Sequence, residues 1–311
     1  MEGTLRMIIE PSLRSTLLDG QVAIVTGGSR GIGGATSTML AANGARVVIA
    51  DVDQAKADET AAGLNEEFGA GTASVFVADL VAPEACDDLV SETITRHGQL
   101  DIVVNNAGYA WDAGIHAMAD DQFQAMLDIH LVVPFRLARA CAPVFRAAAK
   151  ADDDKGVIRH RKTVMVSSLA GVNGLRGAGN YASAKAGVVG LLRTLAQEWG
   201  SMHVNVNGVA FGIIQTRFGL PQSDREVIET GGRTIHVGMP AKQAQRLGVS
   251  IDPDNPPTEA EVYAAKPLPG LTILGRTGTI NEAADSIFFL CSPLSNYITG
   301  QLIHVSGGFL G

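Results

Sequence analysis

The chain has 311 residues, and 46% of them are hydrophobic, which is enough apolar material for a large buried core. Its formal net charge of −8 argues against a nucleic-acid partner, because a protein that binds the phosphate backbone of DNA or RNA usually carries a surplus of Lys and Arg. The short basic run 159–162 follows the acidic run 152–154 and is interpreted as a charged, solvated turn. No apolar run has membrane-spanning length, and residues 1–18 lack the apolar core of a signal peptide. We therefore expect a cytoplasmic protein with a small-molecule partner, and neither a nucleic acid nor a membrane as partner.

Cysteine usage indicates a reducing compartment. Cys86, Cys141 and Cys291 lie far apart in the chain, and no pair has the spacing of metal ligands. We therefore expect buried thiols, no disulfide framework and no metal site.

The first predicted element is a buried strand that runs directly into a glycine-rich turn. Val22–Thr26 is a short apolar, β-branched run, and a helix is predicted to extend to about Asn43. Between them, residues 27–33 read Gly-Gly-Ser-Arg-Gly-Ile-Gly. Glycines permit a sharp turn and a close approach to a pyrophosphate, and the helix N-terminus offers free N–H groups. The spacing Gly-x-x-x-Gly-x-Gly departs from the usual Gly-x-Gly-x-x-Gly, but its place between strand and helix predicts a dinucleotide site.

The second predicted strand, 46–50, ends at an acid that bears on cofactor choice. Asp51 lies about 20 residues beyond the glycines, where an acid accepts hydrogen bonds from the adenosine ribose. Its charge would repel a 2′-phosphate and favours NAD. Arg30 has the opposite tendency and leaves NADP possible, and Asp53 can alternatively cap the next helix. The predicted cofactor is therefore NAD, with NADP as the alternative through Arg30.

Further strands alternate with helices, which predicts a doubly wound parallel sheet. Asp79 follows the third strand, where it can accept from the adenine amino group or cap the next helix. Asn105–Gly108 follows the fourth strand and supplies small residues at a carboxyl strand end, as a cofactor crevice requires.

A long helix is expected to be interrupted near Pro134. The further predicted elements are helices at 54–68, 83–97, 121–150, 181–199 and 281–291, the last capped by Thr279 or Asn281, and strands at 73–77, 101–104, 162–167, 203–209 and 301–305.

Three residues after the fifth strand suggest proton exchange with an alcohol or ketone. Tyr181 and Lys185 are four apart, so a helix places both on one face. An ammonium beside a phenol favours the phenolate and lowers the tyrosine pKa. Ser168 falls at the carboxyl end of the strand, where its hydroxyl can donate to an oxygen on which charge develops. The pattern Tyr-x-x-x-Lys alone is common by chance, and the upstream dinucleotide turn is what makes the interpretation specific.

Residues 217–274 contain seven prolines and no persistent period. A segment this long without regular strands is uncommon unless it is functional. We interpret it as a substrate lid with one or two helices; a surface insertion that serves oligomer contacts is the alternative. The expected organisation is an N-terminal extension, residues 1–17, followed by one domain, residues 18–311, that carries the lid.

Over roughly residues 18–311 the sequence resembles the short-chain dehydrogenase/reductase family, and within it bacterial 3-oxoacyl-ACP reductase-like members. The resemblance rests on Thr26–Gly33, Asp79, Asn105–Gly108, Ser168, Tyr181-x-x-x-Lys185, Asn205–Thr216 and Val305–Gly308.

This resemblance implies an α/β fold with a Rossmann-type, seven-stranded parallel sheet of order 3-2-1-4-5-6-7, and a homotetramer or dimer. It implies Tyr181 as general acid/base, Ser168 as oxyanion partner, and Lys185 as modulator of the tyrosine pKa and ligand of the nicotinamide ribose. The expected cofactor-binding residues are Gly27, Ser29, Arg30, Gly31, Ile32, Gly33, Asp51, Val52, Asp79, Leu80, Asn106, Ala107, Gly108, Tyr181, Lys185, Gly212, Ile214 and Thr216.

Two substitutions depart from the family pattern. His130 stands where the family usually has Asn, which helps to hold a water in a proton relay to the lysine. Imidazole can take that role as donor and acceptor, can titrate near neutral pH, or can merely satisfy the local backbone. Phe211 replaces the usual proline after the sixth strand and can reshape the nicotinamide wall. His130 is thus a fourth candidate catalytic residue.

The sequence predicts an NAD(P)(H)-dependent oxidoreductase that interconverts a secondary alcohol and a ketone, with a 3-oxoacyl thioester as the first substrate candidate. Asp51 and the long lid keep open a hydroxysteroid or other bulky secondary-alcohol dehydrogenase. The substitutions at His130 and Phe211 keep open a non-catalytic cofactor-binding protein.

Overall fold

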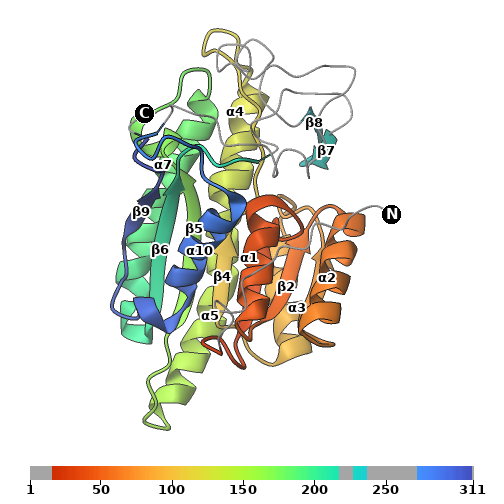
Figure 1. The fold of residues 1–311 in the computed structure, drawn as a ribbon, viewed down its shortest axis with the longest axis vertical. Helices are drawn as coiled ribbons and strands as arrows, with labels where there is room; N and C mark the ends of the chain where they lie inside the picture. The colour runs from red at the N-terminus through yellow and green to blue at the C-terminus, as the bar shows by residue number, and fades with distance from the viewer. Residues whose placement is uncertain (1–15, 217–226, 237–271, 310–311) are drawn as a thin grey trace.

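The structure, a computed structural model, describes residues 16–216, 227–236 and 272–309. Within them, seven strands form one parallel sheet in the order β3-β2-β1-β4-β5-β6-β9 (Figure 1). Because β9 is the last strand of this sheet along the chain, the predicted Rossmann-type strand order is confirmed. The order reverses between β1 and β4, which is where ligands bind in sheets of this kind.

The described elements closely follow the predicted ones outside the lid. The strands are β1 (Val22–Thr26), β2 (Arg46–Asp51), β3 (Ala73–Val77), β4 (Ile102–Asn105), β5 (Arg161–Ser168), β6 (Val204–Phe211), β7 (Val227–Thr230), β8 (Arg233–His236) and β9 (Leu302–Val305). The helices are α1 (Gly31–Ala42), α2 (Gln54–Phe68), α3 (Ala85–His97), α4 (Asp120–Leu127), α5 (Val133–Asp153), α6 (Ala170–Asn173), α7 (Gly179–Trp199) and α10 (Ile280–Cys291), with shorter helical turns η2 (Asp128–Val132), η3 (Gly200–Met202) and η5 (Pro293–Ser295).

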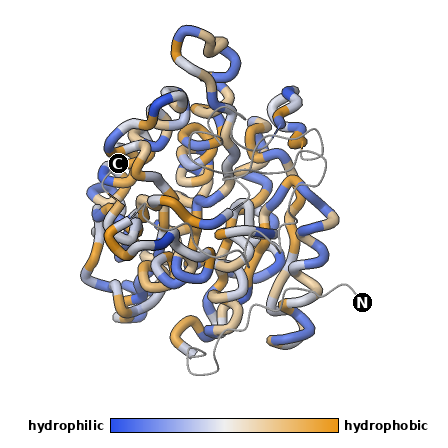
Figure 2. The backbone as a smooth tube through the Cα atoms, turned by 45° about the horizontal axis from the view of Figure 1, so that its top comes forward, coloured by the Kyte–Doolittle hydropathy of each residue, from blue (hydrophilic) through white to orange (hydrophobic). Residues whose placement is uncertain are grey.

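Helices cover both faces of the sheet because strand side chains alternate between two cores. In β1, Val22 and Ile24 belong to one buried cluster, whereas Ala23 and Val25 belong to the other. The first cluster includes residues of α3, α5 and α7, and the second includes residues of α1, α2 and α10. Figure 1 shows the second group of helices in front of the strands, and Figure 2 shows hydrophilic stretches on the outer helices and loops. Both faces of the sheet are thus closed, and its carboxyl edge remains for a site.

The long helix is interrupted near Pro134, as predicted. α4 ends at Leu127, five residues form the π-helical turn η2, and α5 begins at Val133 with Pro134 in its first turn. Proline is tolerated there because the first N–H groups of a helix have no partner inside it. Single π-turns are frequent at functional sites, and this one carries His130.

The predicted lid contains a regular hairpin, so the expectation of a segment without strands is wrong for residues 227–236. β7 and β8 pair in antiparallel fashion. Gly231 and Gly232 connect them with φ values of 58° and 71°, which a tight hairpin turn with two left-handed residues requires. The remaining lid predictions, including its helices, lie largely outside the described residues, as does most of the N-terminal extension.

The basic run interpreted as a solvated turn is partly buried, so that interpretation is wrong for two of its residues. Arg161 and Lys162 begin β5 and are 4% and 2% exposed. Arg161 pairs with Asp152 at 2.8 Å, and the Lys162 ammonium donates to Asn205 Oδ1 at 3.1 Å and Asn296 Oδ1 at 2.8 Å. Burial lowers the pKa of Lys162 to about 8. The partners that make the burial of Lys162 tolerable are distant in sequence, so a local charge pattern does not reveal them.

The core position of Phe145 gives a stability prediction. Its side chain is fully buried, and its ring meets Trp199 edge-on with centroids 5.6 Å apart. Phe145→Ala leaves a cavity, so we expect the free energy of unfolding to fall by about 3–5 kcal/mol. The matched control is Phe135→Ala on the exposed side of the same helix, with an expected cost below about 1 kcal/mol. Urea denaturation measures both, and similar losses in the two variants would contradict this core assignment.

Candidate active site

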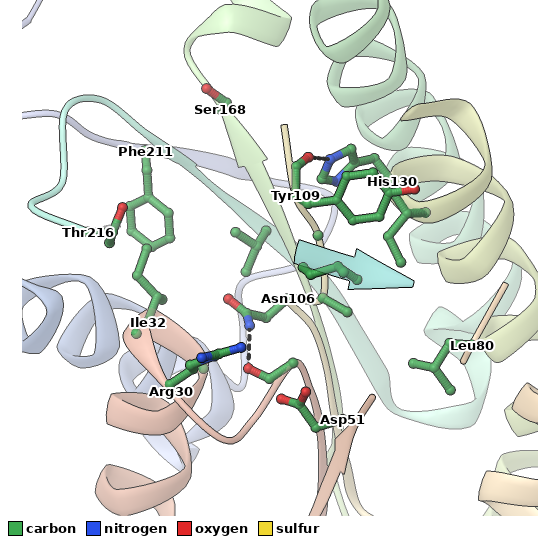
Figure 3. Close-up of a pocket in the computed structure, with 18 of the residues that line it drawn as sticks. Arg30, Ile32, Asp51, Leu80, Asn106, Tyr109, His130, Ser168, Phe211 and Thr216 are labelled. Carbon is green, nitrogen blue, oxygen red and sulfur yellow. Dashed lines mark hydrogen bonds between the residues drawn. The ribbon is translucent and has the colours of Figure 1, made fainter. Parts of the chain in front are cut away.

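A cavity of about 340 Å³ lies at the carboxyl ends of the central strands. Figure 3 labels residues of its lining, among them Asp51 at the end of β2, Ser168 at the end of β5 and Phe211 at the end of β6. Every sequence-predicted site residue except Ser29 lines it. These are the catalytic candidates Ser168, Tyr181, Lys185 and His130, and the cofactor candidates Gly27, Arg30, Gly31, Ile32, Gly33, Asp51, Val52, Asp79, Leu80, Asn106, Ala107, Gly108, Gly212, Ile214 and Thr216.

The glycine turn is packed so closely that side chains are excluded. A Cβ on Gly33 would lie 1.9 Å from the Gly27 carbonyl oxygen, and one on Gly27 would lie 2.9 Å from Ala107 Cα. Asn106 fixes the turn from β4, because its Nδ2 donates to the carbonyls of Thr26 at 2.9 Å and Gly27 at 3.2 Å. The first N–H groups of α1 have no partner inside the helix and border the cavity. This cradle fits the pyrophosphate of a dinucleotide.

Asp51 is fixed at the tip of β2. Its Oδ2 accepts the Ser29 hydroxyl at 2.5 Å, and its Oδ1 accepts the N–H groups of Val52 at 2.8 Å and Asp53 at 3.1 Å. Ser29 therefore orients the carboxylate from outside the cavity wall. Arg30 pairs with Asp53 at 3.2 Å, and Asp53 also caps α2 by accepting the Lys56 N–H. The alternative of a helix cap at Asp53 is thus confirmed.

The segment after β6 forms another wall. The Gly212 N–H donates to the Val305 carbonyl at 3.1 Å, and the Ile214 backbone bridges to Gly278. These contacts tie the segment to the end of β9 and to the residues before α10, and they direct Gly212, Ile214 and Thr216 to the cavity. Phe211 is 6% exposed and lines the same wall (Figure 3).

The three predicted catalytic residues come together where β5 ends and α7 begins. Tyr181 lies in the first turn of α7, one turn before Lys185. The Ser168 side chain is hydrogen-bonded to Tyr181, and its Oγ accepts the Ala170 N–H at 3.1 Å. Lys185 Nζ donates to the Val166 carbonyl at 2.6 Å and lies 5.7 Å from the centre of the Tyr181 ring.

The pKa of Tyr181 is shifted against the sequence-based expectation. Burial raises it to about 12, although the hydrogen bond from Ser168 opposes the rise and the charge of Asp112 adds to it. Burial also lowers the pKa of Lys185 to about 7, so that its ammonium is itself destabilised and a weaker aid to the phenolate. Among the described residues, with no cofactor charge beside them, Lys185 does not give Tyr181 a low pKa, so that expectation is wrong.

His130 is buried beside the tyrosine. It is 3% exposed, and its ring meets that of Tyr181 edge-on at 5.0 Å between centroids. Its Nε2 lies 2.7 Å from the Tyr109 carbonyl oxygen (Figure 3). A carbonyl only accepts, so Nε2 carries the proton and Nδ1 has a free lone pair. Among the described residues Nδ1 has no hydrogen-bond partner, and a Cβ on Gly108 would lie 2.7 Å from it.

This environment decides between the interpretations of His130. Burial holds the pKa of its imidazole well below the usual range, and the charge of Lys185 acts in the same direction. The interpretation of His130 as a group that titrates near neutral pH is therefore wrong. Its Nε2 does satisfy a backbone carbonyl, and its Nδ1 still offers a buried acceptor at the cavity.

Sequence reasoning missed several cavity residues, most clearly Tyr109, Ile228 and Thr230. The last two lie on the β7–β8 hairpin. Gly231-Gly232 between two β-prone runs is a hairpin signal that could have located it. Its docking at the cavity had no comparable signal.

The chain matches known proteins along nearly its whole length. Residues 21–226 match the short chain dehydrogenase family, and residues 260–310 match a family described as enoyl-(acyl carrier protein) reductase. The chain is 31% identical over 290 residues to the 3-oxoacyl-acyl-carrier-protein reductase FabG of Escherichia coli (strain K12), covering 93% of this chain and 97% of the relative. It is 29% identical over 294 residues to the FabG of Thermotoga maritima, covering 94% and 99%. It is 32% identical over 287 residues to the short-chain reductase protein NovJ of Streptomyces niveus, covering 92% and 93%.

The neutral state of His130 predicts a pH dependence of stability. Folding lowers its pKa below the unfolded value of about 6.5. The unfolded chain therefore binds the extra proton below that pH, and stability declines as pH falls through it. Between pH 7.5 and 5.5 we expect the wild type to lose about 1.4 kcal/mol more than His130→Asn. Urea denaturation at both pH values measures the losses, and equal losses would contradict a neutral His130.

Proposed function

Because the chain belongs to the short-chain dehydrogenase/reductase family, we propose that it interconverts a secondary alcohol and a ketone with NAD(H) as hydride carrier. The chain is an oxidoreductase that acts on CH–OH groups with NAD or NADP, which is the reaction class of the family. The observation that carries the finer proposal is that Tyr181, Ser168 and Lys185 share one cavity with the glycine turn and Asp51.

Tyr181 and Ser168 act on the substrate oxygen. When bound, the nicotinamide ring takes a hydride from the carbinol carbon or returns it to the carbonyl carbon. In reduction Tyr181 gives its phenolic proton to the substrate oxygen, and Ser168 donates a hydrogen bond to the same atom. The Ala170 N–H occupies one lone pair of Ser168 Oγ and helps to direct the hydroxyl proton. In oxidation the proton returns from the alcohol to the phenolate.

Lys185 and His130 support the proton exchange of Tyr181. The pKa of Lys185, about 7, lets its amine release and regain a proton near neutral pH. We propose that Nδ1 of His130 accepts a hydrogen bond from the Lys185 amine, either directly or through one water. Support comes from the free Nδ1 lone pair and from the electrostatic effect of Lys185 on His130. Because Nε2–H is committed to Tyr109, the imidazole orients a donor rather than carrying the proton onward.

The preference for NAD over NADP rests on the carboxylates around the ribose site. Asp51 is held at the cavity wall by four donors, so its charge is well placed to repel a 2′-phosphate. Arg30, the cation that would attract that phosphate, is already paired with Asp53. NADP binding would have to disrupt that pair.

A 3-oxoacyl thioester is the proposed substrate class. Support comes from the names of the curated relatives, several of which are 3-oxoacyl-acyl-carrier-protein reductases. Exposed aliphatic side chains at Ile115 and Leu175 lie on the loops that flank the catalytic residues, and these loops meet at the bridge between Ala113 and Ala178. Such a rim suits an acyl chain, and it equally suits a bulky hydrophobic alcohol, the second candidate.

Assembly and location are proposed on the family resemblance. We propose a homotetramer, with a dimer as the alternative, in the cytoplasm. The three cysteines are buried and free, which suits a reducing compartment. In the part of the chain that the structure describes, no helix has the length and apolar content needed to cross a bilayer.

Tyr181→Phe tests the acid/base assignment. The variant lacks the phenolic proton but keeps the ring, so we expect ketone reduction to fall on the order of 10²–10⁴-fold with little change in NADH affinity. Steady-state rates and NADH fluorescence titration measure the two effects. Persistent turnover would show that another group supplies the proton. A wild type that binds NADH but reduces no ketone would favour the non-catalytic alternative.

Asp53→Asn tests the cofactor preference. Asparagine still caps α2 but lacks the charge that holds Arg30, so we expect kcat/KM with NADPH to rise on the order of tenfold while that with NADH changes little. Parallel assays of the wild type should favour NADH. A wild type that prefers NADPH would mean that Arg30 outweighs Asp51.

A further inference from the structure

The β7–β8 hairpin presents one face to the cavity and the other to solvent. Thr230 is 5% exposed and Ile235 is fully buried, whereas Glu229 and Thr234 are exposed. Ile228 packs against the main buried cluster and lines the cavity together with Thr230. This alternation is that of a strand pair with one packed face. The hairpin is therefore a docked part of the site.

Asp79 holds this hairpin with both carboxylate oxygens. The Thr230 hydroxyl donates to Oδ1 at 2.8 Å, and the Gly231 N–H donates to Oδ2 at 2.6 Å. Oδ1 also accepts the Val81 N–H at 3.0 Å. Hydrogen bonds to a charged acceptor are stronger than neutral ones, so these donors direct the carboxylate towards the hairpin. The alternative role of Asp79 as a helix cap is wrong, because Glu84 occupies the N-cap of α3.

Two further contacts join the hairpin to the supports of His130. The Thr230 hydroxyl lies within hydrogen-bonding reach of the Tyr109 hydroxyl, whose own proton is directed to the Ala125 carbonyl oxygen at 3.5 Å. Arg233 Nη1 lies 3.3 Å from Oδ2 of Asp128, the first residue of η2. The Tyr109 carbonyl and the η2 turn are the two elements that position His130. Ile228 and Thr230 of the hairpin line the same cavity as Tyr109 and His130, the last two of which are labelled in Figure 3.

We propose that the hairpin is the outer wall of the adenosine half of the dinucleotide site, and that Asp79 acts by holding this wall through Thr230 rather than by binding adenine. The inference rests on the proposed dinucleotide cofactor. Asp51 and Leu80, next to the tips of β2 and β3, line the same cavity as Ile228 and Thr230. A nucleoside bound against the strand tips therefore meets the hairpin on its outer side, and Thr230 is the positioning residue of that wall.

The adenine amino group gives the first test. Reduced nicotinamide hypoxanthine dinucleotide carries a carbonyl oxygen in place of that group, so a carboxylate that accepts from adenine would lose its donor. With Asp79 committed to the hairpin, we expect the wild type to bind NADH and the analogue with dissociation constants within about threefold, as measured by calorimetry. A preference for NADH on the order of tenfold or more, abolished in Asp79→Asn, would overturn the inference.

Variants of the hairpin give the second test. Thr230→Val keeps the shape but removes the hydroxyl, and we expect it to weaken binding of both dinucleotides about tenfold. Thr230→Ser retains the hydroxyl and should restore affinity. Thr234→Val, on the exposed face of the same hairpin, is the matched control and should bind as the wild type does. Far-UV circular dichroism and thermal melts confirm that each variant is folded.

A double-mutant cycle separates holding from direct binding. If Asp79 acts through Thr230, Asp79→Asn combined with Thr230→Val should weaken NADH binding no more than the stronger single variant. Multiplying effects, or an unchanged affinity in Thr230→Val, would overturn the inference while leaving the proposed function intact. Failure of the wild type to bind any dinucleotide would overturn both.

Discussion

The site depends on the close crossing of the backbone at Gly27 and Gly33. A side chain at Gly33 would collide with the Gly27 carbonyl and with Asn106 Nδ2, so only glycine lets α1 begin this close to β1. The same amide of Asn106 ties the turn to β4, across the point where the strand order reverses. The N-terminus of α1, the tips of β1 and β4 and the cavity are thus fixed as one unit.

Burial determines the protonation states of the catalytic residues at their end of the cavity. Tyr181 and Lys185 have opposite pKa shifts that both favour their neutral forms, and His130 is held neutral beside them. In the part of the chain described, the Lys185 amine has a backbone carbonyl as its hydrogen-bond partner rather than a carboxylate. Such a site holds protons that are readily exchanged between neighbours, because no strong ion pair fixes the charge on one group. A bound nicotinamide cation would add the positive charge that favours the phenolate.

Sequence reasoning reached the sheet and the motif residues because their signals are local. The run Val22–Thr26 is β-branched, the glycine turn follows at once, and the tyrosine and lysine lie one helical turn apart. It failed where contacts span the chain. Thr230 meets Asp79 across 151 positions, and no local pattern encodes that pairing. The burial of Lys162 depends on Asn296, 134 positions away. The spacing does not predict the raised pKa of Tyr181, because spacing shows which groups are neighbours, whereas the effect of burial depends on the packed structure.

The central claim is that a hydride passes from NADH to a carbonyl carbon while Tyr181 supplies the proton. The most direct measurement uses NADH that carries one deuterium at C4, prepared in both stereochemical forms. Each form is incubated with acetoacetyl-CoA, and the product is examined by mass spectrometry. The account predicts that one form gives a 3-hydroxyacyl product with a single deuterium on the carbinol carbon, and that Tyr181→Phe yields almost none of it. Product that lacks deuterium with both forms, or label transfer undiminished in the variant, would contradict the account.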